Sequence, residues 1–134
     1  MQTYKASVDE VEFAPGLDPS EGWIEMKVQF LIDRASAGAR EMVIGRTVFE
    51  PGSRHDLHRH ENAEEFQYLL SGEGVVLNGD EEVPVSPGQI VFTPAGEWHG
   101  FRNASDTEDA VLFWGWCGAG DRETAGYEVK EGQH

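Results

Sequence analysis

The chain has 134 residues, with 25 acidic side chains against 10 lysines and arginines, so its formal net charge is −15. This length supports one hydrophobic core and excludes a second domain with a core of its own. The negative charge repels phosphate backbones and anionic lipids, which excludes nucleic acid and membrane surfaces as electrostatic partners.

The start of the chain, MQTYKASVDEVEF, has neither a basic region nor the continuous apolar stretch of a signal peptide. No later segment approaches the roughly 18 apolar residues of a membrane span. Cys117 is the only cysteine, which excludes an intrachain disulfide, and we expect it to be a small buried residue on a strand. These features predict a soluble, cytoplasmic protein.

Short apolar runs, separated by turn residues, follow one another along the chain. The first predicted strand covers residues 26–32, and the segment DRASAGAR after it reads as a loop. Further strands are predicted over residues 42–49, 66–70, 74–77, 83–85, 90–93 and 110–117. Many short strands and no convincing helix favour a β-sandwich or jelly roll.

Several turn residues set the expected ends of these strands. Pro51-Gly52 should end the second strand, and Asn78-Gly79 predicts a type I′ hairpin turn, which needs positive φ at both central residues. Pro84 predicts an edge strand, since proline cannot donate to the ladder. The polar segment beyond Gly118 is expected to lie on the surface or to fray.

His58 and His60 are the first candidates for metal ligands. Residues two apart on a strand face the same side, about 6.6 Å apart at the backbone, so both imidazoles could reach one ion. Arg59 would then point to the opposite face. Glu65 opens the next apolar run after a short loop, so a turn could return its carboxylate to the same ion.

The remaining candidate metal ligands lie in the loop after His60, on the next strand and in a later turn. Glu64 would point away from Glu65, and Glu61 lies in the loop between them. His99 comes from a separate turn that follows Pro94 and Gly96. Three imidazoles and one carboxylate suit iron, manganese, nickel, cobalt, copper or zinc, and disfavour magnesium and calcium, which prefer oxygen ligands.

The spacing of these residues resembles the cupin family. From Gly52, five residues lead to His58, one to His60, four to Glu65 and six to Gly72. From Gly88, five lead to Pro94, one to Gly96, two to His99 and three to Asn103. These are the residue types and spacings of the two cupin motifs, and no motif position departs from the pattern.

The resemblance covers roughly residues 42–117 and implies an all-β, double-stranded β-helix, the jelly-roll barrel of cupins. On this basis, residues 41–117 form the barrel core, residues 1–40 an N-terminal arm with the first strands, and residues 118–134 a polar tail. A homodimer is also implied, with Met26–Ile32 a candidate for exchange between subunits.

Carried over position by position, the family's metal ligands fall on His58, His60, Glu65 and His99. The resemblance therefore implies one divalent transition metal per chain. Asn103, the last residue of the second motif, is expected to be a structural hydrogen-bonding residue.

Strand period also suggests which side chains surround the ion. Gln67 and Leu69 share the face of Glu65, and Phe101 shares that of His99. These residues predict a largely apolar pocket with walls formed by Phe101 and by Trp114 or Trp116, in which the Gln67 amide is the polar group. Such a pocket would favour a small substrate with a flat or apolar part.

Gln67 and His55 are the candidates for catalytic residues. His55 lies three residues before His58 and therefore out of phase with the ligand face, so a surface position is favoured over a rim position as proton shuttle. Arg46 and Arg54 could anchor a carboxylate, and His134 is expected to be inert.

The leading functional hypothesis is a metal-dependent oxygenase acting on a small diol, enol or phenolic compound. An alternative is a redox-silent lyase, isomerase or cyclase on a small hydroxy or keto acid. A third is a metal-containing module that binds a small molecule without turning it over.

Overall fold

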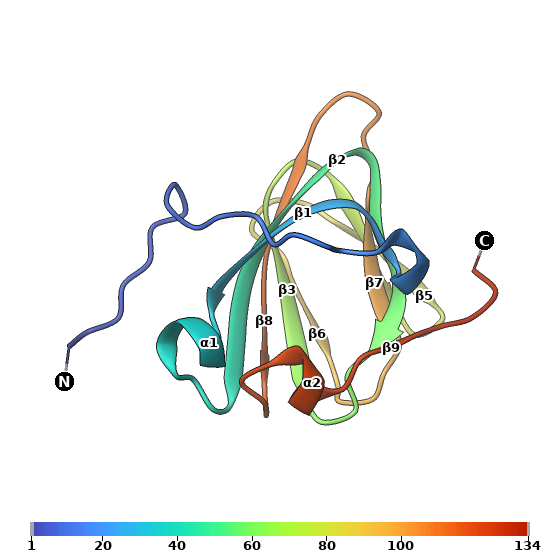
Figure 1. The fold of residues 1–134 in the computed structure, drawn as a ribbon. Coiled ribbons are helices and arrows are strands. Elements are labelled where there is room, and N and C mark those ends of the chain that lie inside the picture. The colour runs from blue at the N-terminus through green and yellow to red at the C-terminus, as the bar shows by residue number, and fades with distance from the viewer. Residues whose placement is uncertain (1, 134) are drawn as a thin grey trace.

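In the computed structural model, which describes residues 2–133, a nine-stranded antiparallel sheet curls into a nearly closed barrel (Figure 1). The strands are β1 (Trp23–Ile32), β2 (Met42–Arg59), β3 (Glu64–Ser71), β4 (Gly74–Asn78), β5 (Glu81–Val85), β6 (Ile90–Thr93), β7 (His99–Asn103), β8 (Ala110–Cys117) and β9 (Glu128–Val129). The helices are short: η1 (Pro19–Glu21), α1 (Arg34–Ala37) and α2 (Arg122–Ala125). His134 lies outside the described residues.

The strand order is β5-β4-β7-β2-β8-β3-β6, and both β1 and β9 pair with β2. Sequential strands are often not neighbours in this order, as a jelly roll requires, so the predicted all-β double-stranded β-helix is confirmed. Pro84 lies on β5 at one end of this order, which is the edge position that the sequence predicted. Within residues 2–133, no helix is long and apolar enough to cross a membrane.

Strand period places the barrel interior as expected. On β3, Glu65, Gln67 and Leu69 are buried, whereas Phe66 and Tyr68 are only partly covered on the outer face. The inner residues of β8, including Leu112, Trp114 and Trp116, close the interior from the neighbouring strand. Cys117 lies at the end of β8 and is exposed, so the expectation of a buried cysteine was wrong.

Strand β2 does not end at Pro51-Gly52, contrary to the prediction. It runs on to Arg59 and changes partner on the way: its first half pairs with β8, and its second half pairs with β7. Gly52 makes this bend possible, because its φ of 85° lies in the left-handed region that favours glycine. The strand thus passes around a corner of the barrel, which carries it directly into the histidines.

The hairpin between β4 and β5 is shifted by one residue from the predicted turn. Asn78 pairs with Glu81, so the two loop residues are Gly79 and Asp80, and Gly79 alone of the two has positive φ. Asn78 is held in the strand because it also pairs with His99 and accepts a hydrogen bond from Thr93 at 2.9 Å.

The predicted loop over residues 33–40 contains the four-residue helix α1. Its ends are fixed by local chemistry: Asp33 and Ser36 form a reciprocal capping box, and Gly38 ends the helix in the left-handed region. The loop prediction was therefore wrong for residues 34–37.

The first strand pairs with β2 of its own chain, from Trp23 opposite His55 to Ile32 opposite Ile44. Exchange of Met26–Ile32 between subunits, and the homodimer itself, stay predictions. Light scattering at micromolar concentration would check them, since an apparent mass near the 14.9 kDa of one chain would contradict a dimer.

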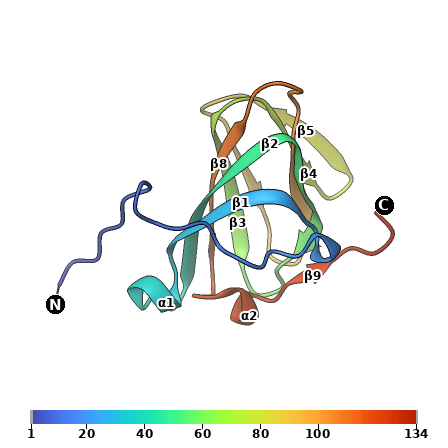
Figure 2. The same cartoon turned by 45° about the horizontal axis from the view of Figure 1, so that its top comes forward.

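The segment after β8 differs most from its prediction. Instead of lying free, it forms α2 and β9 and crosses one end of the barrel, as both views show (Figure 1, Figure 2). Ala119 and Ala125 are completely buried, and β9 pairs with the end of β2. Residues 119–129 are therefore part of the folded barrel.

Candidate metal centre

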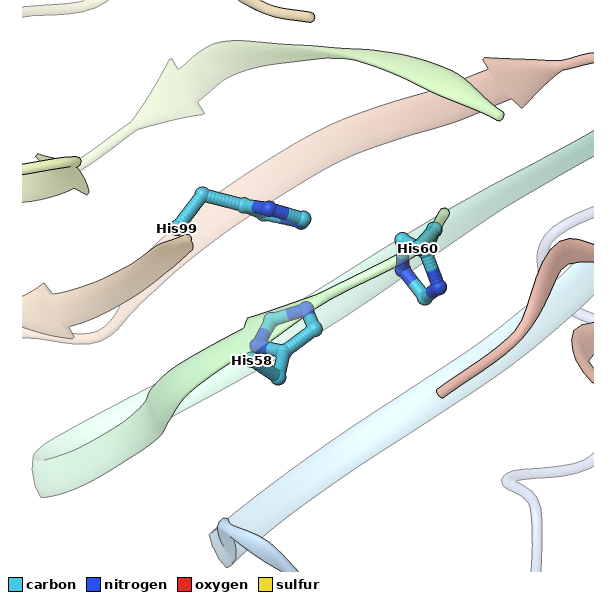
Figure 3. A group of neighbouring side chains, drawn as sticks. All are labelled: His58, His60 and His99. Carbon is cyan, nitrogen blue, oxygen red and sulfur yellow. The ribbon is translucent and has the colours of Figure 1, made fainter. Parts of the chain in front are cut away.

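Three histidines meet inside the barrel, and the sequence predicted all three (Figure 3). His58 lies near the end of β2, His60 directly follows that strand, and His99 begins β7. Their ligand nitrogens lie within 4.8 Å of one another, and all three side chains are buried. Residues far apart in the sequence thus present imidazoles to one small space.

The ring tautomers suit metal binding, because each histidine uses Nδ1 for a backbone hydrogen bond. His58 Nδ1 lies 2.7 Å from the carbonyl oxygen of Asp56, His60 Nδ1 2.7 Å from that of Gly126, and His99 Nδ1 3.1 Å from that of Glu97. A carbonyl can only accept, so each Nδ1 carries the proton and each Nε2 keeps its lone pair. This is the usual arrangement of metal-ligating histidines, whose second nitrogen is fixed by an outer partner.

Glu65 is buried beside the three imidazoles and does not turn out to solvent. One carboxylate oxygen lies 2.9 Å from His99 Nε2, and the other lies 3.5 Å from His60 Nε2. Glu64, its neighbour on β3, is exposed on the opposite face. Despite the short distance to Glu65, His99 Nε2 has no well-aligned hydrogen bond among residues 2–133. A divalent metal with nitrogen and oxygen ligands would use this orphaned nitrogen, so the donor set fits such an ion.

Burial and neighbouring charge act in opposite directions on Glu65 and His99. Burial alone would raise the pKa of Glu65, but the charge of the nearby His99 and the close approach of His60 outweigh it and hold this pKa well below its usual range. Burial would lower the pKa of His99, but the Glu65 carboxylate outweighs it and raises this pKa. The carboxylate is therefore ionised and available as a ligand at neutral pH.

The pKa of His58 is shifted in the opposite direction to that of His99. Burial, followed by repulsion from His55, His99 and His60, holds the pKa of His58 well below its ordinary value. The ring is neutral at pH 7, which is the form that binds a metal.

His55 is not the surface residue that its spacing suggested. A β-bulge between His55 and His58 adds one residue to β2 relative to β7, so both histidines face the same side. The His55 ring stacks on His58 at 3.6 Å between centroids and packs on Trp23 at 4.2 Å. The bulge is set by pairing with β7, and no pattern local to β2 predicts it.

The C-terminal segment supplies groups that sequence reasoning missed. Gly126 provides the carbonyl that orients His60, and the Tyr127 ring stacks over His58 at 5.3 Å. The Tyr127 hydroxyl donates to the carbonyl of Glu21 at 2.6 Å and accepts from His55 Nε2 at 2.9 Å. The only local signal was an aromatic residue in an otherwise polar stretch.

A small cavity adjoins the histidines and has the predicted walls. Phe101, Trp114, Trp116 and Gln67 line it together with Glu65, His58 and His60, as the sequence anticipated. Trp23, Met26, Thr47, Phe49, His55, Gly100 and Leu112 complete the lining. Its free volume of ≈ 30 Å³ holds about two water molecules, so a ligand must be very small or must displace part of the aromatic wall.

The other residues singled out from the sequence have structural partners. Arg46 donates to Gln29 at 3.0 Å, and Arg54 donates to Asp56 at 3.0 Å, so neither points a free guanidinium at the cavity. Asn103 donates to the carbonyls of Phe49 and Glu108 and accepts from Ser105, which agrees with its expected structural role.

Comparison with known proteins agrees with the fold and the site. The family model for the cupin domain matches residues 45–116, and the chain belongs to the cupin family. Its relatives include the oxalate-binding protein of Thermotoga maritima, 32% identical over 84 residues, which are 63% of this chain and 69% of that protein.

A second relative has a named enzymatic activity. Dimethylsulfoniopropionate lyase DddW of Ruegeria pomeroyi is 32% identical over 92 residues, which are 69% of this chain and 59% of that enzyme. The chain therefore spans less than two thirds of the length of this lyase.

Solved structures repeat the same architecture. A predicted oxalate decarboxylase from Thermotoga maritima superposes with a TM-score of 0.74 at 25% identity, over 85% of this chain and 98% of that one. The polyketide cyclase RemF from Streptomyces resistomycificus gives a TM-score of 0.76 at 24% identity, over 96% of this chain and 85% of that one, and shows the fold alone.

Proposed function

We propose that this chain is a metal-dependent enzyme in which His58, His60, His99 and Glu65 hold one divalent transition metal that activates a small oxygen-bearing substrate. The observation that carries the proposal is the fixed tautomer of the three imidazoles. Each Nδ1 is committed to a backbone carbonyl, which leaves the Nε2 lone pairs beside an ionised carboxylate.

The chain's own residues suit this role. A divalent metal would supply a Lewis acid that polarises a substrate oxygen. The burial of the ligands and the aromatic wall leave room for little water, which strengthens electrostatic interactions inside the cavity. Glu65 stays ionised because of His99 and His60, so the carboxylate keeps its negative charge across neutral pH.

Redox-silent chemistry is the reaction class that we favour, as a lyase, isomerase or cyclase on a small hydroxy or keto acid. The two curated relatives are named an oxalate-binding protein and a dimethylsulfoniopropionate lyase, and neither name is that of an oxygenase. The oxygenase hypothesis therefore moves to second place. It rests on the same four residues, which would hold a redox-active metal such as iron or manganese as well as a redox-silent one.

The reaction class is tested with protein that is stripped of metal and reloaded separately with iron, manganese, cobalt, nickel and zinc. Each form is incubated with oxalate, dimethylsulfoniopropionate and a panel of small hydroxy and keto acids, in air and under strict anaerobiosis. Turnover without oxygen supports the proposal. Turnover that requires oxygen favours the oxygenase, and tight binding with unchanged ligand favours a binding module.

The metal ligands are tested by substitution, with metal content measured by elemental analysis. His58→Ala and Glu65→Gln should each lower metal content at neutral pH and leave the far-ultraviolet circular dichroism unchanged. Glu64→Gln is the matched control, because Glu64 is the neighbouring carboxylate on the outer face of β3. Full metal content in both ligand variants would refute the assignment.

A further inference from the structure

We propose that the indole N–H of Trp23 and the side-chain amide of Gln67 bind the free oxygen of a small carboxylate whose other end reaches the metal. This inference rests on the proposed function and names the substrate class and two substrate-binding residues. It derives from hydrogen-bond donors that the fold leaves unused.

Three tryptophans line the cavity, and two of them have paired indole nitrogens. Trp114 Nε1 donates to Thr47 Oγ1 at 2.8 Å, and Trp116 Nε1 donates to the carbonyl of Ala119 at 3.1 Å. Trp23 is just as deeply buried, yet its Nε1 has no acceptor among residues 2–133. Buried donors are almost always paired, so this N–H calls for an acceptor that enters the cavity.

Gln67 has a second unpaired donor in the same cavity. Its side chain is 4% exposed and lines the cavity, and Nε2 has no partner within the described part of the chain. Gln67 lies two residues after Glu65 on β3, so its amide follows the metal-binding carboxylate along the same face. Trp23 and Gln67 thus present two unpaired donors to one cavity.

The backbone of β1 is bent in a way that brings Trp23 to this position. Trp23 and Met26 are three residues apart, and yet both line the cavity, because the register shifts between Ile24 and Met26. Glu25, at this shift, has a φ of 52°, the only positive value for a non-glycine residue in the described chain. The buried Ser53 hydroxyl, 3.0 Å from the carbonyls of Ile24 and Glu25, supports the bend.

Glu25 therefore adopts a backbone conformation that is uncommon for a non-glycine residue. A regular strand would turn Trp23 or Met26 away from the interior. Residues held in sparsely populated backbone conformations by specific hydrogen bonds are frequent at ligand sites. Trp23 also packs on His55, which stacks on His58, so its indole stands beside the metal-binding group.

The chemistry of the cavity points to an anionic oxygen as the acceptor. An indole N–H can only donate, and Glu65, which the metal would use, is the only carboxylate in the lining. A divalent ion and a single carboxylate leave the site with net positive charge. The Arg122 guanidinium, 5.5 Å from the Trp23 ring centre, adds positive charge behind the indole. The free volume of ≈ 30 Å³ restricts the carboxylate to a very small one.

The proposal is tested by calorimetric titration of manganese-loaded protein with oxalate, glycolate and pyruvate. Trp23→Phe removes the indole N–H and keeps an aromatic ring, and Gln67→Leu removes the amide at nearly constant volume. Each change should weaken the binding of at least one probe by about tenfold or more, because a hydrogen bond to a charged group is lost. Metal content should remain at the wild-type level in both variants.

Trp98→Phe is the matched control, since Trp98 lies on the outer surface under Arg59 and outside the cavity lining. It should bind the probes as the wild type does. Two independent variants keep the test valid if one fails to fold, which circular dichroism reveals.

Three results would overturn the proposal in whole or in part. Dissociation constants within twofold of wild type in both variants, with metal retained, would overturn it entirely. Weaker binding in only one variant would show that the other residue does not bind the carboxylate. Absence of binding of all three probes to metal-loaded wild type would overturn the carboxylate assignment, whereas the proposed function fails separately, through the metal content of His58→Ala.

Discussion

Gly45 on β2 gives the sharpest test of how the cavity wall is packed. It lies directly opposite Trp114 on β8, and a Cβ added at Gly45 would come within 2.2 Å of Cζ2 and 2.6 Å of Cε2 and Cη2 of that indole. The indole cannot retreat freely, because Nε1 donates to Thr47 and Phe30 packs against the ring edge. Gly45→Ala must therefore push Trp114 toward the cavity or break its hydrogen bond.

The loss of stability expected for Gly45→Ala comes from the displaced indole and from its broken hydrogen bond. Overpacking a buried contact costs about 1–3 kcal/mol, and leaving a buried donor and acceptor unpaired costs about 1–3 kcal/mol more. We expect Gly45→Ala to lower the free energy of unfolding by about 2–6 kcal/mol, and the melting temperature by roughly 10 °C. Urea and thermal unfolding of the metal-free protein, followed by circular dichroism, measure both quantities.

The Trp114→Phe background provides the control. Phenylalanine lacks the indole atoms that the new Cβ would meet, so Gly45→Ala should cost at least 1 kcal/mol less in this background than in wild type, as a double-mutant cycle measures. Additive effects of the two changes, or an unaltered unfolding midpoint for Gly45→Ala alone, would refute the packing argument.

Three further predictions follow from the site and its supports. Truncation after residue 118 removes the carbonyl that orients His60, so metal affinity should fall by about 10–100-fold, measured by competition with a metallochromic chelator; wild-type affinity would contradict the role given to this segment. Asn103→Ala removes one hydrogen bond from β7 to Phe49 on β2 and two to the loop that follows β7, so urea unfolding should show a loss of about 1–3 kcal/mol, and a loss below 0.5 kcal/mol would argue against a structural role. In the metal-free protein, the lowered pKa of His58 means that stability falls as pH drops below the ordinary value of 6.5, because the unfolded chain binds the proton first. The lowered pKa of Glu65 makes stability fall further below pH 4.5, whereas the raised pKa of His99 acts in the opposite direction. We expect the two lowered pKa values to dominate, so the urea midpoint should decline from pH 7 to pH 4; a midpoint that rises over this range would contradict that balance.

Local sequence signals located most of the candidate site. His58 and His60 share a strand face by period, and Glu65, Gln67 and Leu69 share another, so their common orientation follows from the two-residue repeat of a β-strand. The motif spacing then linked these residues to His99. The ends of the strands were less predictable: β2 runs past Pro51-Gly52 because its second half finds a new partner in β7.

The sequence by itself determined the all-β class, the interior face of β3, and the three histidines and one glutamate that lie close together inside the barrel. These features depend on alternation and spacing along a few residues, which the chain carries locally. The tertiary structure decided the rest: the bulge that turns His55 inward, the bend at Glu25 that brings in Trp23, and the C-terminal segment that orients His60. Each of these depends on pairing between segments far apart in the chain, whose geometry no local pattern encodes.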